Sequence, residues 1–180
     1  PFSGLTPVPA WEPQSAWQGT LDFEELPWQK NPPCGYIVSA NHAIVGPDYP
    51  HFLSWDFNSG VRAQRVEQLL LAQPLHDLAS FKAIQLDVVT LLGQRLRDRC
   101  RSLRLKEPLQ LQALNLLLRW DGSALHGSCG ASVYEVTLSS LAQVVLERTW
   151  GRALSLEVLG ETSLNPICHV GHHASRYHAV

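Results

Sequence analysis

The chain has 180 residues, of which 45% are hydrophobic and 17% charged, and its formal net charge is −2. This composition allows one sizeable buried core and differs from that of disordered chains, which are poorer in apolar residues and richer in charge. A small net charge gives no general attraction to nucleic acid or to an anionic membrane, so we expect neither as a partner. No run is expected to reach the roughly 18 apolar residues of a membrane-spanning helix.

The first 60 residues are rich in proline and tryptophan. Nine of the 12 prolines and four of the six tryptophans lie between positions 1 and 55. Proline disrupts helix interiors and pushes the preceding residue toward extended backbone, so this part of the chain is expected to be loop-rich. Only short strands fit there, near residues 19–23 and 36–40.

After residue 60 the apolar spacing becomes helical. A first helix is predicted from about 61 to 72, with Pro74 ending it. A second helix is predicted to start near Asp77 and to run as far as residue 92, because its apolar positions follow an i, i+3, i+7 stripe.

Two further helices are predicted in the second half. Pro108 opens the third, over residues 109–120, and the turn signal Asp121-Gly122 stops it. The fourth contains Tyr134 and ends near Gly151. The chain therefore divides into an extended part at 1–60, a helical region at 61–160 and a polar, histidine-rich tail at 161–180.

Cysteines and histidines give no clear metal site. The four cysteines are widely separated and form no CxxC pair, so they mark neither a metal cage nor a disulfide framework, and the redox compartment stays open. The tail offers enough ligands for zinc in principle, but their spacing matches no standard site. The cysteines are Cys34, Cys100, Cys129 and Cys168, and the tail histidines are His169, His172, His173 and His178.

A basic stretch could contact phosphate. It comprises Arg95, Arg97, Arg99, Arg101, Arg104 and Lys106, with Asp98 among them. Cations are also favoured at the C-terminal end of a helix by its dipole, and no aromatic residues are interleaved as in nucleic-acid-binding segments. A solvated helix end is therefore the preferred interpretation.

The segment from Asn31 to Arg65 contains the most informative polar residues. Asn41 could use its amide NH2 to stabilise the oxyanion that forms when an amide is hydrolysed. Arg62 keeps its charge and offers five donors, so it could orient that asparagine or a substrate carbonyl. The alternative is structural. Asn41 lies between an apolar run and Pro47, where asparagine often forms a turn, and Arg62 could be a solvated residue at the start of a helix.

Several motifs follow one another along the chain: PVPAW at 7–11, WQG at 17–19, FEELP at 23–27, NPPCGYI at 31–37, SANH at 39–42, the YP pair at 49–50, the arginine at 62 and LLLRWDG at 116–122. Their order resembles that of the penicillin acylase family of N-terminal-nucleophile (Ntn) hydrolases. By this resemblance, Asn41 matches the oxyanion-hole asparagine of the family and Arg62 its active-site arginine. The implied fold class is α+β, with part of an Ntn-hydrolase αββα core and a mainly helical region.

The resemblance also implies a chemistry that this sequence does not complete. Family members attack a linear amide C–N bond of an acylated amine with an N-terminal serine, whose own amine serves as base. Pro1 stands at the first position here, so we expect an internal fragment of the catalytic beta subunit that is inactive alone. Its partners would be the rest of the heterodimer, namely the alpha subunit and the serine-bearing part of beta, together with a small acyl-amide substrate.

Other expectations follow from the family alone. No cofactor is needed for the chemistry, a structural calcium ion is implied in the parent protein, and Asp56 is the only nearby carboxylate candidate for it. The implied location is periplasmic or secreted. Penicillins, acyl-homoserine lactones and other acyl amides all remain open as substrates, with antibiotic metabolism as one role. The alternative function is a noncatalytic helical binding or assembly module.

Overall fold

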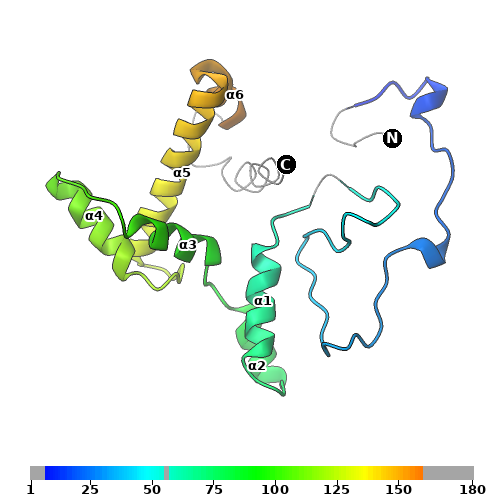
Figure 1. Cartoon of the computed structure of the whole chain (residues 1–180), viewed down its shortest axis with the longest axis horizontal. Helices are drawn as coiled ribbons and strands as arrows, with labels where there is room; N and C mark the ends of the chain where they lie inside the picture. Colours follow the sequence, from blue (N-terminus) through cyan, green and yellow to red (C-terminus); the bar gives the residue numbers. More distant parts are fainter. Residues whose placement is uncertain (1–6, 55–56, 160–180) are drawn as a thin grey trace. The chain divides into compact units, whose positions relative to one another are not determined.

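The computed structural model describes residues 7–54 and 57–159, with side chains to residue 156 (Figure 1). Asp56, Cys168 and the histidine-rich tail lie outside the described residues. The chain forms two compact units, which divide between residues 63 and 64. Each unit is described separately.

The first unit is an extended chain with little regular structure. It contains two short 3-10 helices, η1 at Pro13–Ser15 and η2 at Phe23–Glu25. The strands expected near 19–23 and 36–40 are absent from the described residues, because an extended segment becomes a strand only when a neighbour pairs with its backbone. One isolated parallel bridge, between His42 and Asn58, is present instead.

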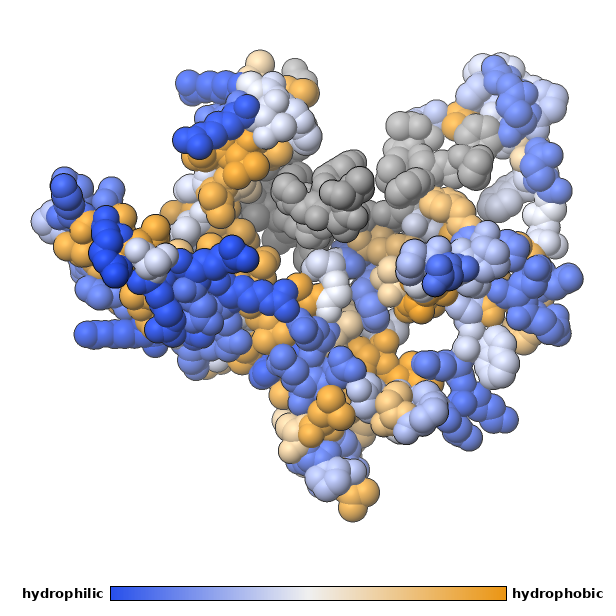
Figure 2. All heavy atoms as spheres, viewed as in Figure 1, coloured by the Kyte–Doolittle hydropathy of each residue, from blue (hydrophilic) through white to orange (hydrophobic). Residues whose placement is uncertain are grey.

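This first unit buries little of its apolar surface. Among its described residues only Ala40 and Ala63 are buried. In contrast, Trp11 is 86% exposed and Trp17 is 97% exposed. Hydrophobic side chains on the surface are visible in Figure 2. Exposed tryptophans on this scale indicate a segment that would be stabilised by burial against other polypeptide.

The second unit is helical. Its helices are α1 (Val61–Leu71, which begins just before the boundary between the units), α2 (Leu78–Gln85), α3 (Leu91–Cys100), α4 (Pro108–Arg119), α5 (Cys129–Trp150) and α6 (Arg152–Leu159). The predicted helices at 61–72 and 109–120 are confirmed within one residue at either end. The fourth is also confirmed: it begins at Cys129, and the hydroxyl of the N-cap residue Ser128 accepts a hydrogen bond from the backbone N–H of Ala131.

The single helix predicted from Asp77 to residue 92 is wrong. The chain forms α2 and α3 instead, with an extended connector over residues 87–90. Residues 88–90 form backbone hydrogen bonds to residues 122–124, and Thr90 caps α3 by accepting a bond from Gly93. These bonds to a distant segment replace those that a continuous helix would have made.

The core of the second unit lies where α3, α4 and α5 meet. Its buried residues are Cys100, Leu117, Trp120 and Tyr134. The rings of Trp120 and Tyr134 stack with centroids 5.2 Å apart, and the indole Nε1 donates to the carbonyl of Ser123. The LLLRWDG motif therefore supplies the central side chain of this core.

Helix α5 is unusual for its length and apolar character. It has 22 residues and is the one helix in the described part of the chain that is long and apolar enough to cross a membrane, contrary to the expectation from sequence. Length and composition alone are weak evidence for a span, because core helices of other proteins share them. Tyr134 and Leu146 of α5 are buried in this structure.

Candidate functional site

Asn41 lies in a constrained turn. Its φ angle is +59°, in the left-handed region that asparagine tolerates better than most other residues. The carbonyl of Asn41 accepts a hydrogen bond of 2.6 Å from the backbone N–H of Asn58, next to the bridge between His42 and Asn58. Two segments far apart in the first unit therefore fix the backbone at Asn41.

Arg62 is directed at Asn41 from the first turn of α1. Its Nη1 donates a hydrogen bond of 3.3 Å to Oδ1 of Asn41. Both side chains are exposed. The two residues singled out from the sequence are therefore hydrogen-bonded to each other. They do not point separately into solvent.

This hydrogen bond determines what the asparagine can do. Because Oδ1 accepts from Arg62, the amide NH2 of Asn41 keeps its two donors for another acceptor. The guanidinium also adds positive charge beside those donors. The arrangement is suited to a carbonyl oxygen that gains negative charge during reaction.

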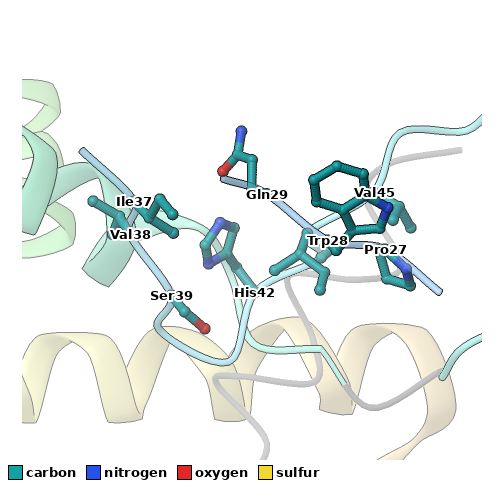
Figure 3. A pocket seen from close by; sticks show the side chains of 10 residues that line it. Pro27, Trp28, Gln29, Ile37, Val38, Ser39, His42 and Val45 are labelled. Atoms are coloured by element: carbon teal, nitrogen blue, oxygen red, sulfur yellow. The ribbon is translucent and has the colours of Figure 1, made fainter. Parts of the chain in front are cut away.

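An open pocket lies next to Asn41 in the chain. Its volume is about 600 Å³, and two segments line it: residues 27–29, and residues 37–39 together with 42–45 (Figure 3). Apolar side chains such as Trp28 and Ile37 make up most of the lining, and Ser39 and His42 add polar groups. Neither Asn41 nor Arg62 is among the lining residues, so the pair lies beside this pocket and not inside it.

His42 is the residue that sequence reasoning missed. Its ring extends into the space between the two lining segments in Figure 3, and its Nδ1 accepts a long hydrogen bond of 3.4 Å from the backbone of Ala40. The sequence did contain an indication of its importance, because His42 is the last residue of the SANH motif. The sequence could not show which side of the turn this ring would occupy.

The FEELP and YP motifs hold two loops of the first unit together. The hydroxyl of Tyr49 donates to the carbonyl of Glu25 at 2.7 Å, and the carboxylate of Glu25 lies 3.3 Å from Nε2 of His51. The rings of Tyr49 and His51 meet edge to face, 5.7 Å apart. These motifs therefore have a structural role in positioning the chain on both sides of Asn41.

Several arginines of the basic stretch form hydrogen bonds or ion pairs with other groups of the second unit. Arg97 donates to the carbonyl of Trp120 at 2.8 Å, and both Arg97 and Arg101 pair with Asp98. Hydrogen bonds from these two arginines hold the pKa of the Asp98 carboxyl below its usual value. Arg104 donates to nearby backbone carbonyls. This arrangement favours a helix end over a phosphate site.

No disulfide or metal cluster is present in the described part of the chain. Cys34, Cys100 and Cys129 are free thiols. Within residues 7–54 and 57–159, no three His, Cys, Asp or Glu side chains gather closely enough to hold a metal ion.

Comparison with known proteins places the chain in a family. The penicillin amidase family model matches residues 1–177. A penicillin acylase 2 proenzyme from a Pseudomonas species is 32% identical over 148 residues, which cover 82% of this chain and 19% of that protein. An acyl-homoserine lactone acylase QuiP from Pseudomonas fluorescens is 29% identical over 160 residues, which cover 81% of this chain and 20% of that protein.

A second QuiP acylase, from Pseudomonas putida, is 30% identical over 155 residues, covering 78% of this chain and 19% of that protein. The chain thus spans about a fifth of the length of the curated relatives that it matches. The resemblance inferred from the ordered motifs is confirmed by a match along almost the whole chain. The chain belongs to the penicillin amidase family.

Proposed function

We propose that these residues are part of an amidohydrolase that cleaves the linear amide C–N bond of an acylated amine. The observation that carries this proposal is the hydrogen bond from Arg62 to Asn41 within a chain of the penicillin amidase family. The relatives named above are penicillin and acyl-homoserine lactone acylases, which supports an acyl amide as the class of substrate.

In the proposed reaction, a serine hydroxyl from a part of the protein outside these 180 residues attacks the amide carbonyl carbon. The carbonyl oxygen becomes an oxyanion, to which the NH2 of Asn41 donates. The amine leaves with a proton, and water then hydrolyses the acyl-serine ester through a second oxyanion at the same place. Arg62 holds the amide of Asn41 in the donating orientation, and no metal or cofactor takes part.

The rest of the parent protein would complete the fold as well as the chemistry. The exposed tryptophans and the extended, strand-free backbone in the described part of the first unit fit a piece of an αββα sandwich whose other strands lie in the alpha subunit and the serine-bearing part of beta. The 180 residues alone would then lack activity, because oxyanion donors without a nucleophile give little chemistry. The proposed location is periplasmic or secreted.

The test is to purify the longest natural polypeptide that contains this sequence and to assay it by chromatography for release of amine. A penicillin, an acyl-homoserine lactone and a simple phenylacetyl amide would be the substrates. Hydrolysis that requires both an N-terminal serine and Asn41 would support the proposal. A natural protein without hydrolysis of any of these would contradict it and leave a noncatalytic helical binding or assembly module.

A further inference from the structure

We infer that Arg65 and Asp87 are positioning residues that set the direction of Arg62, an inference that rests on the proposed function of Arg62. The two side chains form a bidentate pair: Nε of Arg65 lies 2.8 Å from Oδ2 of Asp87, and Nη2 lies 2.7 Å from Oδ1. They come from segments 22 residues apart, and both are mostly buried, with side chains 25% and 18% exposed. Such a pair fixes the orientation as well as the position of the guanidinium.

Arg62 and Arg65 belong to the same helix, one turn apart. In α1 they are separated by three residues, which corresponds to a rise of about 4.5 Å and places them as neighbours on the helix surface. A constraint on Arg65 is therefore a constraint on the turn that carries Arg62. A second contact acts nearby, because Arg95 of α3 donates to the side-chain oxygen of Gln64 in the same turn.

Asp87 also offsets the positive charge of Arg65, one helix turn from Arg62. Like charges at this spacing on a helix repel one another. With its guanidinium bound to the Asp87 carboxylate, Arg65 has its charge offset, which weakens its repulsion of Arg62. Loss of Asp87 would remove the anchor and leave two unshielded cations at the start of α1.

Asp87 is itself held by the segment that carries the LLLRWDG motif. Its carboxylate accepts a bond of 3.3 Å from the backbone of Val89. On either side of Val89, the carbonyl of Val88 accepts from Ala124 at 3.0 Å and the N–H of Thr90 donates to Gly122 at 2.9 Å. The turn after Trp120 thus fixes the connector that presents Asp87.

The turn at residues 121–123 is closely packed against Gln94. Gly122 has a φ angle of +101°, and a Cβ atom there would lie 2.6 Å from the side chain of Gln94. The amide of Gln94 in turn donates to the carbonyl of Asp121 at 2.7 Å. Hydrogen bonds therefore link the WDG residues to the connector that carries Asp87, and Asp87 in turn binds Arg65 in the first half of α1.

The experiment compares hydrolysis by the full natural protein with that of two variants, Arg65→Lys and Asp87→Asn. Lysine keeps the charge but loses the bidentate geometry, and asparagine keeps the shape but loses the carboxylate. We expect kcat to fall on the order of tenfold to a hundredfold, with KM changed less than about twofold, because misplacement of a group affects the transition state more than binding. The double variant Arg65→Asp/Asp87→Arg should recover part of the lost kcat.

The matched control is Arg101→Lys, which alters an exposed arginine–aspartate pair on α3 and should leave kcat unchanged. The urea midpoint of every variant is measured in parallel. The inference is overturned if kcat is unchanged in both variants, if KM alone rises, or if the exchanged pair recovers stability without recovering kcat. If either Arg65→Lys or Asp87→Asn does not fold, the other variant decides the question, because both test the same pair.

The same assays distinguish failure of this inference from failure of the proposed function. If the wild-type protein is active and Arg62→Lys lowers kcat, the role of Arg62 stands and the Arg65 and Asp87 variants decide the inference. If the wild type is inactive, the proposed function fails. If the wild type is active and Arg62→Lys is fully active, the proposed function stands, but the role of Arg62 fails and with it the basis for a positioning pair.

Discussion

The amide oxygen of Asn41 accepts a hydrogen bond from Nη1 of Arg62 at 3.3 Å, while the backbone of Asn41 is held in the left-handed region. Because Oδ1 is the acceptor, the NH2 of Asn41 keeps both of its donors for another group. The backbone of the same residue is held as well, because the N–H of Asn58 donates to the carbonyl of Asn41. Asn41 therefore combines a backbone conformation that asparagine tolerates with a charged hydrogen-bond donor to its side-chain oxygen.

Two replacements of Asn41 distinguish the role of its amide from that of its backbone conformation. Asn41→Gly accepts the positive φ angle without strain but lacks the amide, so the full protein should keep its stability and lose on the order of 10² to 10³ in kcat. Asn41→Ala should lose the same activity and also about 1 kcal/mol of stability, because alanine is strained there. Steady-state kinetics and urea denaturation measure the two effects. Full activity of the glycine variant would rule out a role for the amide.

The Arg65–Asp87 pair should make stability depend on pH. Hydrogen bonds from Arg65 hold the pKa of the Asp87 carboxyl below its usual value, against an opposing effect of burial. Because the pKa is depressed in the folded state, the contribution is fully present above the unfolded pKa of about 3.9 and is lost as pH falls through the folded pKa. We expect Asp87→Asn to cost on the order of 1 kcal/mol from pH 7 to about 5, with the cost vanishing toward pH 2.

Urea denaturation of wild type and Asp87→Asn at each pH measures this difference. Arg65→Lys serves as a second probe, since it weakens the same pair from the other side. A difference that stays constant down to pH 2 would show that the loss comes from packing and not from the charge of Asp87.

Gly130 should be intolerant of a side chain. A Cβ atom there would lie 2.4 Å from Cβ of Trp120, whose ring is stacked on Tyr134 and bonded to Ser123 and so cannot move away. We expect Gly130→Ala to destabilise the protein by roughly 1 to 3 kcal/mol, although alanine normally favours a helix over glycine. Ser140→Ala, at an exposed position of α5, is the control and should change stability by less than about 0.5 kcal/mol. Equal urea midpoints for the two variants would contradict the close packing.

The three described thiols should differ in reactivity. Cys100 is buried, and loss of solvent raises the pKa of its thiol, whereas Cys34 and Cys129 are exposed. Because the thiolate is the nucleophile, iodoacetamide at pH 8 should alkylate Cys100 much more slowly than the other two. Mass spectrometry of peptides over time, with Cys168→Ser to remove the fourth cysteine, checks this order. Rapid labelling of Cys100 in the folded protein would contradict the burial of its thiol.

Much of the helical region was predictable because its signals are local. Pro74 and Pro108 mark boundaries of the helices at 61–71 and 108–119, and the apolar spacing between such boundaries indicates a helix without knowledge of its neighbours. Asn41 and Arg62 were found by the order of motifs around them. Their residue types alone allowed an ordinary turn and a solvated helix start.

The remaining features depend on contacts between distant segments. The apolar stripe after Asp77 favours one long helix, but the connector at 87–90 is extended because its backbone bonds to residues 122–124 and Asp87 binds Arg65. The expected strands near 19–23 and 36–40 need a pairing neighbour, and the described residues supply none. Local propensity therefore determined where helices could begin and end, and hydrogen bonds across 20 or more residues decided which of them formed and where Arg62 meets Asn41.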